Sequence, residues 1–465
     1  MRYHRLFIFF SIAFLQVLFA SLTHGIDKFV VNDNQILTKD FLGFGAEWDT
    51  YYYNGYNISD KDFKLITDRI SNMKLPIVRI MVLGNYCYLG NGKYNWNSDS
   101  MISIYKQLDF CQKEGIKVII CAWGAGYNPN DWLKIPDVSG VDDPKYADVV
   151  GTIMDYLLNT RGYTCIKYFS AVNEPDLQLR NNWGMWLKCV NNIADNFKRH
   201  GLTHKLILLG PETAESNADN WLKNSSVQLS SLLGVYSLHF YASQNLVKSG
   251  GLESIILKNM KYVSNSNSVA ASKPFFITEA GMSDDFKPPY GNPHISDFQY
   301  GIFMADYAVQ AARAGSSAIL AWMLDDNSHK NFYWGMWANK IDNFKIRPWY
   351  YAWSLLSRNF SNGATVYRVE QPKDIRILVA RIHGLTDEYW SICLVNRASS
   401  YKSMSIKIPE AKNTPFSYYD YYSNASTSDV NFFNKSVIKM RSDISGSIIV
   451  NCPPNSVVVL TSLQT

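Results

Sequence analysis

Two glutamates, Glu174 and Glu279, each stand at the end of a short apolar stretch that then breaks. The stretches read AVNEP at 171–175 and FFITEAG at 275–281. An unpaired carboxylate is costly inside an apolar strand, so we expect each glutamate at the mouth of its strand, within reach of solvent and substrate. Two carboxyl groups facing one pocket are the equipment for cleaving a glycosidic bond. The pattern predicts such a pair, provided that the two strand ends meet.

Apolar runs of strand length recur through most of the chain and alternate with amphipathic, helix-like stretches such as 62–73, 101–114 and 298–314. The runs are nearly continuously hydrophobic, as expected for parallel strands covered on both faces. Repeated strand–helix alternation predicts an α/β fold, a TIM (β/α)8 barrel over 41–346, with an open doubly wound sheet as the alternative. The eight predicted strands are 41–48, 77–83, 117–123, 168–174, 206–212, 235–241, 274–279 and 318–324.

The pattern changes after Pro348. A last helix is expected at 349–358, and short β-rich runs separated by turns follow from Val366 onward. This spacing is typical of a small antiparallel β-sandwich, which we assign to 347–465. Residues 26–40 predict a β-hairpin that turns at 32–34; the sequence leaves open whether it closes the bottom of the barrel or joins the sandwich.

The first 25 residues have the pattern of a secretory signal peptide. Arg2 and Arg5 precede an apolar stretch at 6–20, and small residues follow before Gly25. Five Asn-X-Ser sequons, at Asn57, Asn224, Asn359, Asn424 and Asn434, agree with a glycosylated, secreted chain. No later segment is apolar over about 18 residues, so membrane insertion is not expected. An extracellular protein is predicted, with the lysosomal lumen as the alternative destination.

The composition excludes several classes of partner. The formal net charge is only +5 over 465 residues and no cluster of Lys and Arg stands out, so nucleic acid is not an expected partner.

Seven cysteines, an odd number, leave at least one unpaired. No CxxC or HExxH spacing is present, so neither a metal nor another cofactor is expected. Aromatic residues make up 14% of the chain, and Tyr and Trp suit a polyhydroxylated ligand. The oligomeric state is not predicted.

Polar and aromatic residues gather at the predicted strand ends. In a TIM barrel these ends form the active-site rim. Caps and rim salt bridges could explain any one of these residues, but the whole set argues for a site. The set comprises Glu47, Asp49, Arg79, Trp123, Asn173, Glu174, Glu212, His239, Tyr241, Glu279, Trp322, Asp325 and Asp326.

At these positions the chain resembles clan A of the glycoside hydrolases, which are retaining barrel enzymes with catalytic glutamates on strands four and seven. The matching residues are the Asn-Glu-Pro at 173–175, the His-Phe-Tyr at 239–241, the Thr-Glu-Ala-Gly at 278–281, Arg79 and Trp322. The Gly-Phe-Gly at 43–45 and the trailing β-domain are similar to families thirty and thirty-nine, and the HxY triplet to family five. The resemblance implies that Glu174 is the acid/base and Glu279 the nucleophile.

Physical reasoning supports that division of roles. Two carboxyl groups about 5–5.5 Å apart cannot both ionise easily, so one retains a proton. Arg79 and Tyr241 are expected to keep Glu279 ionised, which leaves the proton on Glu174. Asn173 suits a hydrogen bond to the sugar 2-hydroxyl.

Most of the remaining candidates have more than one interpretation. Glu212 could form an inverting pair with Glu174, cap the next helix or bind substrate, and His239 could only orient the site. Arg79 could also be an interior salt bridge. Trp322 is expected as a sugar platform, and Trp334, in the long loop 327–346, as a subsite wall; core or loop packing is the alternative. Trp123 and Glu47 are expected at the rim.

The sequence therefore predicts a secreted retaining β-glycosidase that acts on β-linked poly- or oligosaccharides. Two alternatives are a lysosomal-type exo-glycosidase acting on a glycolipid or glycoside and a non-catalytic carbohydrate-binding barrel. The presence of both glutamates disfavours the second alternative. The sugar, the linkage and the choice between hydrolysis and transglycosylation are not predicted.

Overall fold

Eight parallel strands form a closed barrel, which confirms the predicted fold class. The computed structural model describes residues 26–49, 58–123, 135–214, 218–286, 291–326, 332–360, 363–384, 388–422 and 438–463, so the predicted signal peptide lies outside the described residues. Each strand pairs with its neighbour in chain order, and the last pairs with the first. In ring order the strands are β3 (Gly43–Glu47), β4 (Ile77–Leu83), β7 (Lys117–Trp123), β8 (Ile166–Ser170), β9 (Ile207–Thr213), β10 (Leu233–Ala242), β11 (Phe275–Met282) and β12 (Ala318–Ala321).

Helices surround the barrel, and several carry the N-terminal caps that their sequences provide. Ser59 accepts a hydrogen bond from the backbone of Asp62 in a capping box, and Ser98 caps the next helix. The main helices are α2 (Asp60–Met73), α3 (Asp99–Glu114), α5 (Pro144–Asp155), α7 (Trp183–Arg199), α8 (Ala218–Gln228), α10 (Gly251–Ser264), α12 (Phe298–Ala314) and α13 (Trp349–Asn359).

Shorter elements complete the barrel loops. They are the strands β5 (Tyr88–Gly90) and β6 (Lys93–Tyr94), the helices α6 (Pro175–Gln178), α9 (Gln244–Ser249) and α11 (Ser268–Ala271), the 3₁₀ turns η2 (Gly84–Tyr86), η5 (Pro293–Ser296) and η6 (Lys340–Asp342), and the π-helical η3 (Tyr156–Thr160).

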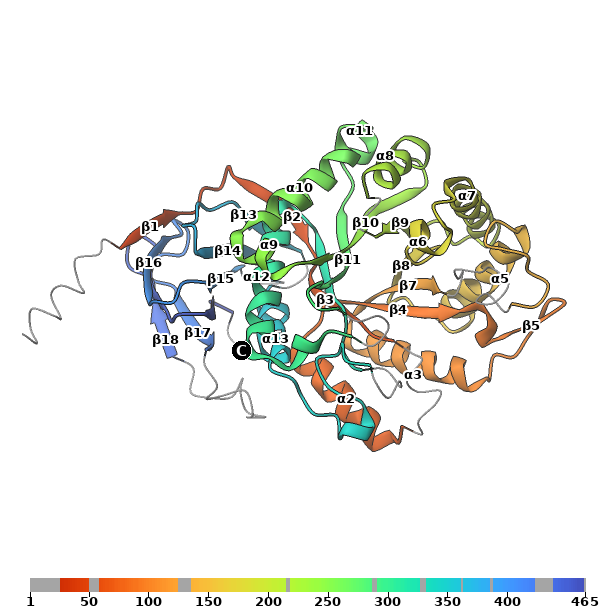
Figure 1. Ribbon diagram of the computed structural model, residues 1–465, viewed down its shortest axis with the longest axis horizontal. Helices are drawn as coiled ribbons and strands as arrows, with labels where there is room; N and C mark the ends of the chain where they lie inside the picture. The colour runs from red at the N-terminus through yellow and green to blue at the C-terminus, as the bar shows by residue number, and fades with distance from the viewer. Residues whose placement is uncertain are drawn as a thin grey trace, which may run out of the picture.

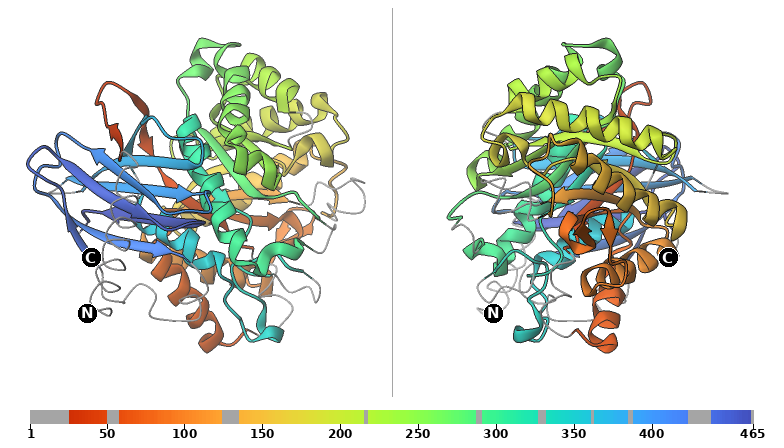
Figure 2. Two further views of the ribbon diagram at one scale, coloured as in Figure 1. Left: turned by 60° about the vertical axis from the view of Figure 1, so that its left-hand side comes forward. Right: turned by 90° about the vertical axis from the view of Figure 1, so that its right-hand side faces the viewer.

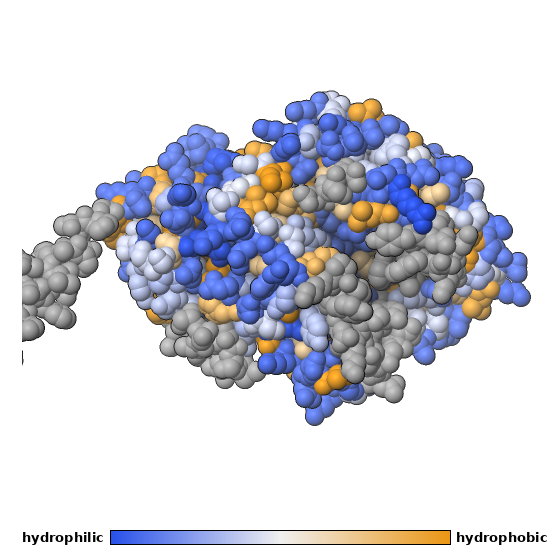
Figure 3. All heavy atoms as spheres, viewed as in Figure 1, coloured by the Kyte–Doolittle hydropathy of each residue, from blue (hydrophilic) through white to orange (hydrophobic). Residues whose placement is uncertain are grey.

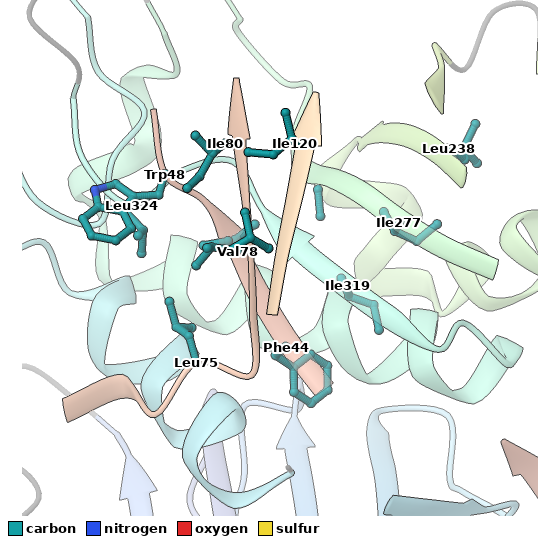
Figure 4. Close-up of a cluster of buried hydrophobic side chains, with 14 of the residues drawn as sticks. Phe44, Trp48, Leu75, Val78, Ile80, Ile120, Leu238, Ile277, Ile319 and Leu324 are labelled. Atoms are coloured by element: carbon teal, nitrogen blue, oxygen red, sulfur yellow. The ribbon is translucent and has the colours of Figure 1, made fainter. Parts of the chain in front are cut away.

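Side chains alternate between the outside and the inside of the barrel along each strand. Val78, Ile80, Ile120 and Ile277 belong to the large outer core between the strands and the helices (Figure 4). A separate apolar cluster fills the interior, with Ile77, Ile119, Tyr168, Leu209, Val235, Phe276, Ala318 and Leu320. This alternation leaves one inward position on each strand for a second layer, nearer the carboxyl end.

That second layer is polar. Arg79, Cys121, Ser170 and Ser237 each stand two residues after a member of the interior apolar cluster, and all four are buried. The apolar cluster closes the bottom of the barrel and excludes water from beneath these groups. The polar layer therefore has one open side, which faces the carboxyl ends of the strands.

The second domain is a β-sandwich, seen beside the barrel in Figures 1 and 2. Its larger sheet is antiparallel, in the order β18 (Ile438–Arg441), β17 (Pro415–Tyr421), β20 (Ser456–Thr461), β15 (Glu388–Asn396), β14 (Ile375–His383), β13 (Ala364–Tyr367) and β2 (Ile36–Phe41). The smaller sheet has the order β1 (Asp27–Val30), β16 (Lys402–Lys407) and β19 (Ser447–Cys452). Apolar side chains of both sheets, such as Ile392 and Met404, form one core between them.

The predicted hairpin over 26–40 is wrong. β1 pairs with β16 in parallel, and β2 pairs with β13, so the two N-terminal strands enter opposite sheets of the sandwich. The turn at 32–34 exists, and Gln35 N donates to Asn32 O across it. Each strand finds its hydrogen-bond partner at a sheet edge more than 300 residues away, which the local sequence does not reveal.

The predicted boundary between the barrel and the sandwich, at 346/347, lies too early in the chain. α13 packs on the barrel: Trp353 Nε1 donates to Gly45 O of β3, and Tyr350 OH donates to Arg69 O of α2. In Figure 1, α12 and α13 lie between the barrel strands and the sandwich. The change from helix to β-structure thus follows α13, because this helix supplies the last layer of the barrel.

Buried charges connect α12 to the sandwich. Asp306 accepts a hydrogen bond from Gln310 Nε2 and lies 3.3 Å from Arg376 Nε and 3.4 Å from Arg397 Nε. All four side chains lie where α12 meets the sandwich, and Asp306 is fully buried. We call Asp306, Arg376 and Arg397 the interface cluster.

The surface and the cysteines add few constraints. On the face shown in Figure 3, hydrophobic side chains are scattered among hydrophilic ones. In the described part of the chain, no helix is long and apolar enough to cross a membrane.

All seven cysteines are buried and unpaired. One sequon is unsuitable for glycosylation in the folded protein, because Asn359 is buried and its amide donates to Leu355 O.

Candidate active site

Glu174 and Glu279 meet at the carboxyl ends of the barrel strands. One carboxylate oxygen of each and a ring nitrogen of His239 all lie within 4.8 Å of one another. Glu279 lies in β11, whereas Glu174 follows β8 and begins α6 with a left-handed backbone, φ 40° and ψ 60°. A non-glycine residue rarely adopts this conformation, and such residues concentrate at functional sites. The carboxyl separation is the short one that retaining glycosidases use.

Arg79 lies beneath this pair and is completely buried. A guanidinium has five N–H donors, and all five have acceptors here. Nε and Nη2 donate to the two oxygens of Glu212, both at 3.0 Å, and Nη2 also donates to Asn173 Oδ1 at 2.7 Å. Nη1 donates to Glu47 Oε2 at 3.0 Å and to Glu279 Oε1 at 3.1 Å. The interior salt bridge and the contact with Glu279 are therefore both present.

Glu47 and Glu212 are not placed to bind substrate. Both side chains have no exposed surface and both contact Arg79, so they hold the guanidinium instead of facing the pocket. Glu212 neither caps α8, which begins at Ala218, nor faces solvent as an inverting base would. Ser170 Oγ donates to Glu212 Oε2 at 2.6 Å, which fixes the carboxylate from the other side. These expectations are wrong for two reasons. Strand alternation turns Glu47 into the barrel, and a left-handed backbone at Glu212, φ 51°, where the register of β9 with β10 shifts, turns that side chain toward Arg79.

His239 and Tyr241, two residues apart on β10, both reach the carboxyl pair. His239 Nδ1 lies 3.0 Å from Glu174 Oε1 and 3.3 Å from Glu279 Oε1, and Tyr241 OH donates to Glu279 Oε2 at 2.8 Å. The Tyr241 ring packs over Gly281, where a Cβ atom would come within 2.8 Å of the ring. The glycine of the TEAG stretch is therefore required by the position of this tyrosine.

Charge and burial shift the pKa values of these groups in different directions. Burial raises the pKa of Glu47 to about 8, because the charge of Arg79 only partly offsets it. Burial acts in the same direction on Glu212, but the charge of Arg79 and the proximity of His239 outweigh it and lower its pKa. His239 is raised to a pKa of about 10: burial disfavours its cation, but Glu279 and the hydrogen bond to Glu174 favour it more strongly. We call Glu47, Glu174, Glu212, Glu279, Arg79 and His239 the active-site cluster.

Glu279 itself has opposing influences. Burial raises its pKa and is opposed by the charges of His239 and Arg79; Glu174 adds to the increase, and the Tyr241 hydrogen bond acts against it. The active-site cluster holds four carboxyl groups against two cations. Like charges at such short distances cannot all ionise easily, so the cluster is expected to retain a proton, and the raised pKa of Glu47 makes it the group that holds one.

The aromatic residues differ in their access to the pocket. Trp322 directly follows β12, its backbone N donates to Ala280 O, and its side chain is partly exposed. Trp334 is 5% exposed and contacts the Tyr241 ring edge-on at a centroid distance of 6.0 Å. It supports Tyr241 and offers a sugar little surface. Trp123 ends β7, and its side chain lies outside the described residues.

Two residues of the site are not among those that the sequence predicts. Ser170 and Cys121 touch Glu212, and both look like ordinary interior residues in the sequence. Asp326, in contrast, was noted at the rim; it accepts hydrogen bonds from the backbone of Trp334 and Gly335 and from Arg347 Nη1. The two-residue period of side chains along a strand could have identified Ser170 and Cys121. Each stands two residues after an apolar residue that points into the barrel, so each points into the barrel too.

The donor set of Glu174, His239 and Glu279 is compact enough to hold a metal ion. A protonated imidazole is not a ligand, and the raised pKa of His239 keeps this ring protonated near neutral pH. Arg79 adds a second positive charge beside Glu279. The charges therefore suit a pair of acid–base carboxyls better than a cation site.

Known proteins of similar fold carry glycosidase chemistry. The chain matches the solved structure of the catalytic domain of a family 30 xylanase C from Talaromyces cellulolyticus with a TM-score of 0.68 and 15% identity, over 94% of this chain and 99% of that one. A family 30 endoxylanase from Clostridium papyrosolvens gives 0.64 and 15%, also over 94% and 99%. A family 51 α-L-arabinofuranosidase from Thermotoga petrophila gives 0.67 and 13%, over 93% and 99%. At these identities the likeness shows the fold, barrel and sandwich together.

Sequence comparison gives the family. Among curated proteins, none matches this chain. The family model for cellulase, glycosyl hydrolase family 5, matches residues 40–340, which include the whole barrel ring and both glutamates. The chain therefore belongs to the cellulase family, glycosyl hydrolase family 5, and is a retaining clan A glycoside hydrolase.

Proposed function

We propose that this protein is a secreted β-glycosidase that hydrolyses β-linked poly- or oligosaccharides by double displacement, with Glu279 as nucleophile and Glu174 as acid/base. The close approach of these two carboxyl groups carries the proposal. Their surroundings support the division of roles. Glu279 accepts hydrogen bonds from Arg79 and Tyr241, which stabilise its carboxylate. The Glu174 side chain is 22% exposed, against 6% for Glu279, so water reaches it more easily.

In the first displacement, a Glu279 oxygen attacks the anomeric carbon and the glycosidic C–O bond breaks. The departing oxygen takes the proton of Glu174, and a covalent glycosyl-enzyme ester remains. His239 Nδ1 lies within hydrogen-bond distance of Glu174 Oε1 and holds this carboxyl toward the pair. Asn173 is fixed by Arg79 through its Oδ1, which leaves its amide N–H₂ available for the sugar 2-hydroxyl.

In the second displacement, Glu174 is ionised and removes a proton from water. The water oxygen attacks the anomeric carbon, and Glu279 leaves as a carboxylate. Negative charge reappears on Glu279 in this step, beside the Arg79 guanidinium. Arg79 is already fixed by Glu212, so no reorganisation is required when that charge develops. If a sugar hydroxyl replaces water, the same step becomes transglycosylation.

Trp322 is proposed as the platform under a bound sugar ring, because it is partly exposed at the strand end beside β11. An aromatic face packs against the apolar face of a pyranose, which favours β-linked chains with equatorial substituents.

Secretion is proposed from the pattern of residues 1–25. When the protein is expressed with its native N-terminus, it should be recovered from the culture medium, and its N-terminal sequence should begin near Ile26.

Activity screening tests the proposal. Wild type and Glu279→Gln are assayed on β-linked glycans that include xylan and cellulose, because two similar structures are named xylanases and the family is named for cellulase. We expect the variant to lose on the order of 10³–10⁶-fold in kcat. Glu253→Gln, which changes a salt-bridged glutamate outside the cluster, is the matched control.

Three outcomes separate the alternatives. Release of single sugars from glycolipids, without action on polysaccharides, would favour the exo-glycosidase. Binding of glycans by both proteins without any turnover would show a carbohydrate-binding barrel. Equal rates for wild type and Glu279→Gln on a hydrolysed substrate would refute the nucleophile assignment.

A further inference from the structure

Arg79 Nη1 connects the nucleophile to a second glutamate that the proposed mechanism does not use. One of its N–H groups points to Glu279 Oε1 at 3.1 Å and the other to Glu47 Oε2 at 3.0 Å. Glu47 ends β3, on the opposite side of Arg79 from Glu212. Whatever charge Glu47 carries is therefore felt by the same guanidinium nitrogen that stabilises Glu279.

The two carboxyl groups on Arg79 have very different surroundings. Glu212 receives two N–H donors from Arg79 and the hydroxyl of Ser170, and the Cys121 thiol lies 3.4 Å away. Glu47 receives one donor, from Arg79, and its Oε1 has no hydrogen-bond partner within the described residues. Both side chains are fully buried. A buried carboxylate needs several donors, and only Glu212 has them.

The other charges near Glu47 disfavour its ionisation. Glu279 on β11 and Asp49 just after β3 are both acidic, and Arg79 on β4 is already shared with Glu212 and Glu279. Burial is the largest influence, and together these effects raise the pKa of Glu47 to about 8. A carboxyl group with one donor, two acidic neighbours and no solvent is more stable as a neutral acid.

We propose that Glu47 is a positioning residue that carries a proton while the enzyme works and thereby leaves the charge of Arg79 to Glu279. The neutral acid still accepts the Arg79 hydrogen bond through Oε2 and keeps the guanidinium in place. It contributes no charge that would compete with Glu279. Glu212 is the permanent anion of Arg79, and Glu47 is its neutral partner. This inference rests on the proposed role of Glu279 as nucleophile.

The proposal has a kinetic consequence in the second displacement. When Glu279 leaves the anomeric carbon, its new negative charge is stabilised by Arg79. If Glu47 loses its proton, a second carboxylate competes for Nη1, and the departing Glu279 is stabilised less. In the glycosyl-enzyme the charge of Glu279, which helps to raise the pKa of Glu47, is absent, so Glu47 loses its proton at a lower pH than in the free enzyme, and the step should slow as pH rises toward 8. Loss of the Glu174 proton does not limit this step, because Glu174 must be ionised to act as its base.

Kinetics on an activated aryl glycoside of the preferred sugar test this consequence. Such a leaving group departs without a proton, so hydrolysis of the glycosyl-enzyme limits kcat. Wild type should lose kcat progressively as pH rises toward 8 and beyond. Glu47→Gln, a neutral isostere, should keep kcat within about threefold near pH 6 and should not show this alkaline loss. A wild-type kcat that is flat from about pH 7 to 9 overturns the proposal, even if the variant does not fold.

A measurement without substrate separates this inference from the proposed function. A carboxyl group whose pKa rises from 4.5 to about 8 on folding stabilises the protein most below pH 4.5, and this contribution is lost as pH rises to about 8. Chemical denaturation should therefore show wild type losing stability relative to Glu47→Gln over that range. Infrared difference spectra should show a carboxylic acid band in wild type at neutral pH that Glu47→Gln lacks. The Glu253→Gln control should leave the carboxylic acid band unchanged.

Two results would contradict the proposed role of Glu47. A folded Glu47→Gln protein with a more than 100-fold lower kcat at every pH would show that the charge of Glu47 is needed. Parallel stability curves for wild type and Glu47→Gln would show that the residue is ionised throughout. If the protein hydrolyses no glycoside but shows the expected stability difference, the proposed function is wrong and the protonation of Glu47 is still supported.

Discussion

The active-site cluster and the interface cluster are both buried and both charged, but they contain opposite excesses. Four carboxyl groups surround Arg79 and His239 at the top of the barrel, whereas two arginines face the single carboxylate of Asp306 between α12 and the sandwich. An excess of buried carboxyl groups retains protons, because like charges at short distance cannot all ionise. An excess of arginines cannot respond in this way, because a guanidinium keeps its proton.

Because of this difference, the active-site cluster can transfer protons, whereas the interface cluster can only hold the two domains together. Every N–H of Arg79 has an acceptor, and the surplus acids around it are free to change protonation. In the interface cluster, Arg376 Nε and Arg397 Nε lie 3.3 and 3.4 Å from Asp306 without good hydrogen-bond geometry. The same kinds of side chain thus support chemistry in one place and domain docking in the other.

After Glu279→Gln, the largest effect is expected for Glu212→Gln. The variant leaves the buried guanidinium of Arg79 without its bidentate anion, so Glu279 is drawn into that role. We expect kcat to fall by about 10²–10³-fold and stability by about 3–5 kcal/mol. Steady-state kinetics and denaturant unfolding measure the two changes. If activity falls with no change in stability, Arg79 is not held by Glu212.

Asp306→Asn should have a similar effect on stability and almost none on chemistry. It removes the carboxylate that lies between two buried arginines, which is expected to cost about 3–5 kcal/mol. The variant should keep kcat within about twofold, because the barrel rim is unchanged. Calorimetry should show the loss. A large decrease in kcat at full stability would contradict the separation of the two clusters.

His239→Gln should alter how stability depends on pH. The folded-state pKa of about 10 exceeds the ordinary value of 6.5, so the stabilisation by His239 is complete below about 6.5 and is lost as pH rises through about 10. Wild type should therefore lose up to a few kcal/mol relative to the variant across that range. Burial raises the pKa of Asp306 to about 6, so Asp306→Asn should not change the slope above neutral pH. If stability depends on pH in the same way in both variants above neutral pH, the two clusters do not differ in this property.

The smallest effect is expected for Ser170→Ala. It removes one short hydrogen bond to the Glu212 carboxylate, worth about 1–2 kcal/mol, and should lower kcat only several-fold. Ser391→Ala, which breaks a buried hydroxyl pair with Thr461 in the sandwich, is the control and should leave kcat unchanged. Equal kinetics for both variants would show that Glu212 needs no support from Ser170.

The barrel was predictable because its signal is local and repeated. Each parallel strand, covered on both faces, must be an apolar run, and the strands β4 and β7 begin and end where the runs predict. The meeting of Glu174 and Glu279 followed from the ring, since all strand ends share one rim. The hairpin prediction at 26–40 was wrong because β1 and β2 are defined by partners far along the chain.

The sequence by itself determined which residues stand at or near the strand ends, and with them the clan and the carboxyl pair. Only the tertiary structure decided which of the rim acids face substrate and which face inward. Glu47 and Glu212 have the same side chain as Glu174 and a similar place in the sequence pattern. Their roles differ because strand register turns Glu47, and an irregular backbone turns Glu212, toward Arg79. There, burial and a shared guanidinium, set by residues from β3, β4, β9 and β11, fix their charges.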